Sequence, residues 1–191
     1  MNNRVLGTVA MICAPALLVE ALILRQQENN VVTGIASMVF MAGWICTNIG
    51  MRRMHATGTG TWGRAVLLVQ LVGLVLAFLF GLFEATRLLG RESIVFNITD
   101  VAWPLSMLWM VVVGVTVVAA RRLSGWRRFV PLMCPFWLPI AVVLSAAFGD
   151  AAGLVGLGYS AVLWALLGYV VFASGDGNHR PASTPSEPAV R

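Results

Sequence analysis

Apolar stretches of about 20 residues, separated by short polar segments, make up most of the chain. They cover residues 5–24, 31–51, 65–86, 101–120, 129–149 and 152–173. About 20 apolar residues in a helix cross the roughly 30 Å hydrocarbon core of a bilayer. The pattern therefore predicts an all-α fold, a polytopic transmembrane helix bundle of six spans, which forms one domain over residues 1–173.

The first and last segments of the sequence need separate interpretation. Residues 1–4 are weakly basic and Ala14-Pro15-Ala16 resembles the cleavage site of a signal peptide, but the apolar run continues to Leu24. A cleaved signal peptide has a shorter apolar region, so we expect a retained first span. Residues 174–191 are rich in Pro, Ser and Gly and have little to bury, which predicts a disordered cytoplasmic tail.

The placement of arginine predicts how the spans are oriented. If the N-terminus is cytoplasmic, ten of the thirteen arginines fall in cytoplasmic segments, and only Arg25, Arg87 and Arg91 fall outside. Membrane proteins keep an excess of basic residues on the cytoplasmic side. The distribution therefore predicts cytoplasmic N- and C-termini in a multi-pass protein of the plasma or inner membrane.

Composition agrees with lipid as the solvent of this chain. Of its residues 59% are hydrophobic and 11% are charged, whereas soluble domains have about a quarter charged residues. The net charge is +5, but the arginines lie at the ends of apolar runs rather than on one basic face. This placement argues against nucleic acid as a partner and leaves the lipid bilayer as the expected one.

Few residues suit cofactor binding or catalysis. The two histidines, His55 and His179, fall in polar segments, so the membrane spans offer no histidine pair for haem, and no ligand spacing indicates zinc. The chain has no lysine, which excludes a retinal or pyridoxal phosphate Schiff base. The three cysteines lie in apolar runs without a CxxC spacing, as is typical of inert buried thiols. We expect no metal and no cofactor.

Several carboxylates lie near the predicted outer boundary of the membrane. They are Glu20, Glu84, Asp100 and Asp150, and Arg87 and Trp103 lie at a similar depth. In one interpretation these side chains reach interfacial water and Glu84 pairs with Arg87 one turn away. In the other, Glu20 and Glu84 point into the bundle and line an outward-facing site for a cation, a proton or a polar headgroup, because ionisable residues within spans are costly.

The third span carries polar and small residues at helical spacing. Gln70, Gly73, Ala77, Gly81 and Glu84 recur at intervals of three or four residues. Small residues four apart let helix backbones approach closely, and Gln70 needs a protein neighbour because lipid would leave its amide unpaired. The face is either a packing seam or the lining of a polar path, and both interpretations place the third helix at the centre of the bundle.

Two further patterns concern an internal repeat of the sequence and the prolines of the fifth span. Glu20 and Glu84 are 64 residues apart, each followed by alanine and by a glutamate eight positions on, which suggests tandem helical hairpins. The alternative is that any series of hairpins with inside arginines looks repetitive. In the fifth span, Pro135 and Pro139 each remove a helix hydrogen bond and are expected to kink the helix.

Three classes of function fit these observations. The first is a membrane protein that binds or transports a small solute, a cation or a lipid through the acidic outer site. The second is a non-catalytic scaffold or regulatory subunit of another membrane protein, motivated by the small residues of the third span. The third is an intramembrane lipid-modifying enzyme that uses a carboxylate as acid or base, and it has the least support, so we expect no enzyme.

Overall fold

The computed structural model describes residues 2–24, 30–90 and 92–175, and all of their regular secondary structure is helical. The α-helices are α1 (Asn3–Cys13), α2 (Ala16–Leu24), α3 (Asn30–Arg53), α4 (Thr61–Thr86), α5 (Ile94–Ala120), α6 (Val130–Met133), α7 (Trp137–Phe148) and α8 (Asp150–Ala173). Two 3₁₀ turns, η1 (Gly125–Arg128) and η2 (Cys134–Phe136), flank α6. The structure describes no residue beyond 175, so the predicted disorder of the tail lies outside the described residues.

Six helical segments are long and apolar enough to cross a membrane, as the sequence pattern predicts. They are Asn3–Leu24, Val31–Arg53, Thr61–Thr86, Ile94–Ala120, Val130–Phe148 and Ala152–Ala173. The fourth begins at Ile94, a full seven residues before the apolar stretch that predicts it, because the helix includes the polar residues Asn97, Thr99 and Asp100. Apolar sequence therefore located each span, while the helices extend past it into polar turns.

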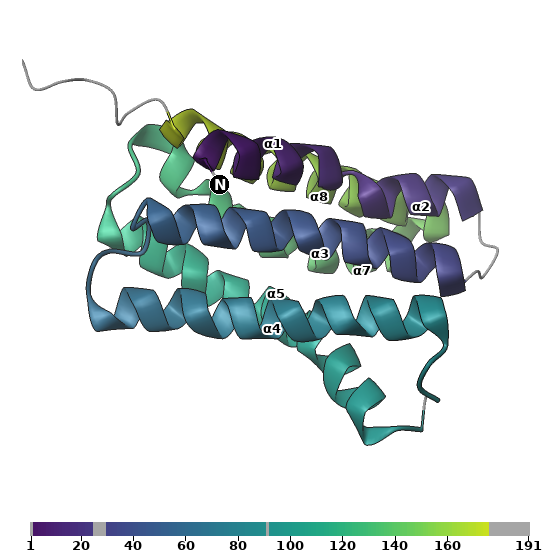
Figure 1. Cartoon of the computed structure of the whole chain (residues 1–191). Helices are drawn as coiled ribbons and strands as arrows, with labels where there is room; N and C mark the ends of the chain where they lie inside the picture. Colours follow the sequence, from purple (N-terminus) through teal and green to yellow (C-terminus); the bar gives the residue numbers. More distant parts are fainter. Residues whose placement is uncertain (1, 25–29, 91, 176–191) are drawn as a thin grey trace, which may run out of the picture.

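The six segments alternate in direction (Figure 1), and their contacts follow a closed cycle. α1 and α2 pack against α3, α3 against α4, α4 against α5, α5 against α6, and α7 against α8, while α8 also packs against α1. Neighbours in the sequence are therefore neighbours in space, which short connections between antiparallel helices favour.

The prediction that the third span lies at the centre is wrong. That span is α4, which packs mainly on α3 and α5 at one side of the bundle. The centre is instead filled by side chains of α3 and α8, where the rings of Trp44 and Trp164 lie 4.3 Å apart and that of Phe40 lies 5.5 Å from Trp164. The small residues of α4 require one close neighbour each, and this requirement is met without a central position.

The two ends of the bundle have different chemistry. One end, at the left in Figure 1, holds the N-terminus, the α3–α4 turn, the α5–α6 connection and the end of α8. We name it the arginine end, because Arg52, Arg64 and Arg121 lie there. The opposite end holds the last turns of α2 and α4 and the first turns of α5, and we name it the carboxylate end, because Glu20 and Glu84 lie there.

Prolines divide two of the spans. Ala14 and Pro15 form a turn between α1 and α2, and the fifth span is broken at η2, which contains Pro135. The expected kink at Pro139 does not occur, since Pro139 is the third residue of α7 and lies in its first turn. The N–H groups of a first turn have no partner within the helix, so proline removes no bond there.

Close helix contacts are made at glycines. A Cβ at Gly34 of α3 would lie 2.6 Å from the backbone nitrogen of Ala85 and 2.6 Å from the carbonyl oxygen of Gly81, both on α4. Gly7 of α1 and Gly168 of α8 meet in the same way, backbone against backbone. The cycle of contacts thus closes through positions at which no side chain separates the helices.

Candidate functional site

Glu20 connects two helices at the carboxylate end. It lies on α2, half-buried, and accepts a 2.8 Å hydrogen bond from the hydroxyl of Thr33 on α3. The next residue, Gly34, packs against the last turns of α4. The first turns of α3 therefore lie between the helix that carries Glu20 and the helix that carries Glu84.

The other residues of the predicted acidic site have different surroundings. Glu84 is half-buried in the last turn of α4, and Arg87 follows the helix, exposed and in the left-handed conformation (φ 53°). Asp100 is exposed on α5, and Trp103, half-buried, packs its ring 5.9 Å from that of Trp137. Asp150 is the first residue of α8, and its side chain is outside the described part of the structure.

Gln70 lies where its sequence context predicts, inside the protein. Its side chain is 1% exposed, and its amide nitrogen donates to the carbonyl oxygen of Ser106 on α5 at 3.2 Å. The orientation of the amide follows from this contact, because a carbonyl oxygen only accepts. The amide oxygen of Gln70 and the hydroxyl of Ser106 are both buried and have no hydrogen-bond partner in the described structure.

The small residues of α4 contact two different helices. A Cβ at Gly73 would lie 2.5 Å from the hydroxyl oxygen of Ser106 on α5, whereas Gly81 lies against Gly34 and Met38 of α3. Ala77, between them, is fully buried. Eight residues turn a helix by about 80° beyond two full turns, so Gly73 and Gly81 face different neighbours.

A groove of about 510 Å³ lies between α4 and α5, and Gln70, Gly73 and Ser106 are among the residues that line it. Its walls are Val69, Gln70, Val72, Gly73, Leu76, Ala102, Leu105, Ser106, Leu108, Trp109 and Val112, none of which carries a charge. The volume falls within the range of about 300–1,000 Å³ that is typical of small-molecule sites. Residues 69–76 are the middle of α4 and residues 102–112 the middle of α5, so the groove lies halfway between the two ends of the bundle.

Two contacts hold the helices on either side of the groove. Toward the arginine end, the indole N–H of Trp109 donates to the carbonyl oxygen of Val66 at 3.0 Å. Toward the carboxylate end, the rings of Phe80 and Phe96 lie 5.3 Å apart. Between them α5 crosses α4 obliquely, and its first turns emerge on the side of α4 away from α3 (Figure 1).

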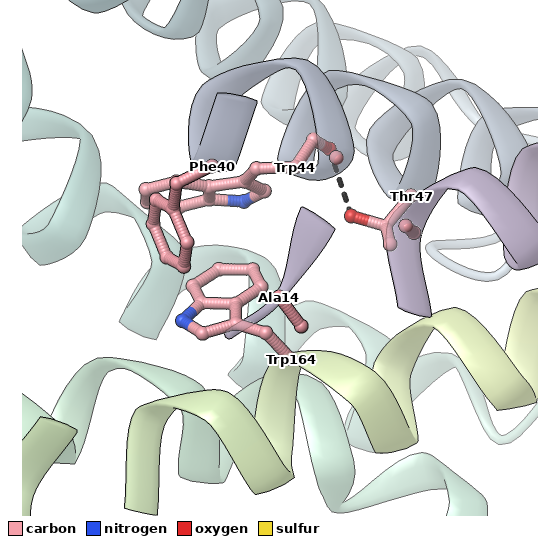
Figure 2. Close-up of a pocket in the computed structure, with 7 residues that line it drawn as sticks. Ala14, Phe40, Trp44, Thr47 and Trp164 are labelled. Atoms are coloured by element: carbon pink, nitrogen blue, oxygen red, sulfur yellow. Dashed lines mark hydrogen bonds between the residues drawn. The ribbon is translucent and has the colours of Figure 1, made fainter. Parts of the chain in front are cut away.

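A much smaller cavity lies in the centre of the bundle (Figure 2). Its volume is about 10 Å³, near the minimum of roughly 10–15 Å³ that one water needs. Trp44, Thr47 and Trp164 line it, and the Thr47 hydroxyl donates to the carbonyl oxygen of Trp44 at 2.7 Å. The indole N–H groups of Trp44 and Trp164 have no partner in the described structure.

Sequence reasoning found Gln70 and Gly73 but not the residues opposite them. The indole N–H of Trp109 donates a hydrogen bond to α4, and the hydroxyl of Ser106 lies against α4. The two residues are three positions apart on the fourth span. The detectable signal was a serine and a tryptophan on one face of an apolar helix. Comparison with known proteins gives no match to a family model, to a curated protein or to a solved structure.

Proposed function

We propose that this protein is an integral membrane protein with both termini on the cytoplasmic side of the cell membrane, and that it binds a lipid-like molecule in the α4–α5 groove. Membrane insertion is supported by the six apolar segments and by large apolar side chains on the flank of the bundle. Ile12, Leu108 and Phe148 are 71%, 68% and 77% exposed. Such a surface would aggregate in water.

The proposed orientation has a direct test. In a variant that lacks the three native cysteines, single cysteines at Asn30 and Ser124 are exposed to an impermeant maleimide on intact cells. Arginine placement predicts that the cysteine at 30 reacts and that the cysteine at 124 does not. The opposite pattern would place the carboxylate end in the cytoplasm.

The observation that carries the ligand proposal is a pair of unpaired polar atoms directly behind the otherwise apolar lining of the groove. The amide oxygen of Gln70 and the hydroxyl of Ser106 are buried without a partner, at the depth where a bilayer offers no water. An unpaired buried polar group costs about 1–3 kcal/mol. A ligand that supplies the missing hydrogen bonds would remove this cost.

The groove restricts the chemistry of the ligand. Its body is apolar, because nine of the eleven lining residues are apolar or glycine. Its polar group is neutral, because no lining residue is charged, and it donates a hydrogen bond to the oxygen of Gln70. A hydroxyl also accepts a bond from Ser106. A long-chain or polycyclic alcohol, or a protonated fatty acid, meets these conditions.

Ser106→Ala tests the proposal, because it removes the unpaired hydroxyl and leaves the carbonyl oxygen that Gln70 contacts. The probe is hexadecanol with a photoreactive diazirine, added to the full-length protein in nanodiscs. We expect crosslinks on α4 and α5 that fall about two- to tenfold in Ser106→Ala, the effect of one neutral hydrogen bond. Val162→Ala, at an exposed position of α8, is the matched control.

Two outcomes would contradict the proposal. Crosslinks distributed evenly over the flank would show that the groove has no preference for the probe. With cysteines introduced at Val72 and Leu105, a disulfide could form between two copies of this chain. Such a disulfide, with no probe bound, would instead support the scaffold function, in which a partner helix occupies the groove.

The acidic site predicted from the sequence is the second candidate. It is supported by the half-buried positions of Glu20 and Glu84 on either side of α3. Against a metal ion, no three side chains of His, Cys, Asp or Glu come together within the described ranges. The remaining hypothesis is a site for a solute or a proton, and the variants Glu20→Gln and Glu84→Gln test it. Binding or transport that is unchanged across pH in both variants would refute this hypothesis.

A further inference from the structure

The turn between α3 and α4 borders another cavity, open to the surface at the arginine end of the bundle. Its volume is about 260 Å³, more than ten times the roughly 15 Å³ that one water needs. Arg52 from the end of α3, His55 from the turn, and Arg64 from the start of α4 all line it. It shares no residue with the α4–α5 groove, so an inference about it is independent of the function proposed above.

The turn that borders this cavity is held in place by packing. Ala56 is fully buried and Thr57 is 6% exposed, although both belong to a turn. The hydroxyl of Thr57 donates to the carbonyl oxygen of Gly63 at 2.8 Å, and the carbonyl of Thr57 lies against Gly63 where a Cβ would collide with it. The turn is therefore folded onto the first turn of α4, and the cavity exists without a ligand.

The turn also holds two residues in the left-handed region. His55 has φ 52° and Gly58 has φ 91°. The backbone N–H of His55 donates to the carbonyl of Arg52 and that of Gly58 to the carbonyl of His55. A histidine in this conformation is uncommon, and here it places the imidazole at the same cavity as the two guanidinium groups.

The positive charge around the cavity has no described carboxylate nearby. Glu84 lies 20 residues beyond Arg64 on the same helix, which is about 30 Å along its axis. Glu20 and Asp100 belong to the same distant end. Charges 30 Å apart are screened at physiological ionic strength, so these acids do not neutralise Arg52 and Arg64.

The start of α4 adds further hydrogen-bond donors. Its N-cap residue, Gly60, supplies no side-chain cap, and Gly63 of the first turn lines the cavity. First-turn N–H groups have no acceptor within a helix and favour a negative charge. Beside them Trp62 is 63% exposed, as is typical of a tryptophan at a membrane–water interface.

We propose that this cavity binds a phosphate group, carried by an anionic lipid headgroup or present as the free anion. Guanidinium groups bind phosphate oxygens through charge-assisted hydrogen bonds. Two of them approach from different helices, and the uncapped start of α4 faces the same space. The phosphate would connect the end of α3 to the start of α4.

The test measures phosphatidylglycerol binding to the full-length protein in nonionic detergent by native mass spectrometry. Diacylglycerol, which has the same chains without phosphate, is the ligand control. The variant is Arg52→Gln/Arg64→Gln, and the matched control is Arg122→Gln/Arg127→Gln, which removes two charges at the same end from residues that do not line the cavity. Thermal unfolding of both variants verifies that they fold.

We expect Arg52→Gln/Arg64→Gln to weaken phosphatidylglycerol binding about 100-fold, since the loss of each charge-assisted hydrogen bond costs roughly tenfold. The control variant should change it less than about threefold. Equal losses in the two variants would show a diffuse charge effect, and no loss in either would show that the cavity is not used. Both of these results would overturn the proposal.

A second arm identifies the source of the phosphate. Inorganic phosphate is titrated against the complex of wild-type protein and phosphatidylglycerol at constant ionic strength. Displacement of the lipid assigns the cavity to the free anion as well. Retention of the lipid, together with its dependence on Arg52 and Arg64, assigns the cavity to a headgroup, as the position of Trp62 favours.

Discussion

The contact between α3 and α4 at Gly34 gives the sharpest prediction about stability. In Gly34→Ala, the new Cβ would lie 2.6 Å from two backbone atoms of α4. Carbon atoms pack at about 3.5–4.0 Å, so the helices would have to separate by roughly 1 Å. Backbone atoms cannot rotate away as a flexible side chain can, so the separation would extend over neighbouring contacts.

The magnitude follows from comparison with a second glycine. Gly158, also inside a helix, has open space where its Cβ would be. Alanine stabilises a helix interior by up to about 1 kcal/mol relative to glycine, and this gain is common to both substitutions. The difference between Gly34→Ala and Gly158→Ala therefore isolates the close contact, for which overpacking predicts about 1–3 kcal/mol.

The assay is the free energy of unfolding of the two variants in mixed micelles, titrated with sodium dodecyl sulfate. Helicity and monodispersity before unfolding serve as controls for correct folding. We expect Gly158→Ala to equal or exceed the wild type and Gly34→Ala to fall below it. Equal stability of the two variants would show that α3 and α4 do not approach as closely as their backbones indicate.

Three further predictions concern single contacts. Trp109→Phe removes the indole donor to Val66 and should lower the free energy of unfolding by about 0.5–1.5 kcal/mol; an unchanged value would show that this bond does not hold α5 to α4. Thr33→Val removes the donor to Glu20 and should destabilise the protein by about 1 kcal/mol while Thr33→Ser does not, measured in the same titration. Cys134, which is fully buried, should resist maleimide in the folded protein and react after unfolding, and rapid labelling before unfolding would contradict its position in the core.

The sequence predicted the spans well because apolar length is a local property. The six segments agree with the apolar stretches, and the largest difference, at Ile94, arises where polar residues extend a helix. Pro135 interrupts the fifth span as expected, since proline lacks the N–H that a helix hydrogen bond needs. Pro139 does not, because the interruption at η2 makes its position the start of a new helix.

The arrangement of the helices was harder to predict, because it depends on residues far apart in the chain. Gln70 required a protein neighbour on physical grounds, but nothing in the sequence identified Ser106 as that neighbour. The centre of the bundle was assigned to α4 from its glycines, whereas the aromatic residues Trp44 and Trp164 mark it. The groove itself follows from the oblique crossing of α4 and α5, which no local pattern encodes.

The most direct test of the ligand proposal is an experimental density map of the full-length protein in lipid nanodiscs prepared from native membranes. The account predicts elongated density between α4 and α5, with its polar end within hydrogen-bond distance of the Gln70 amide oxygen and the Ser106 hydroxyl. A groove closed by movement of α5, or filled by a helix of another chain, would contradict it.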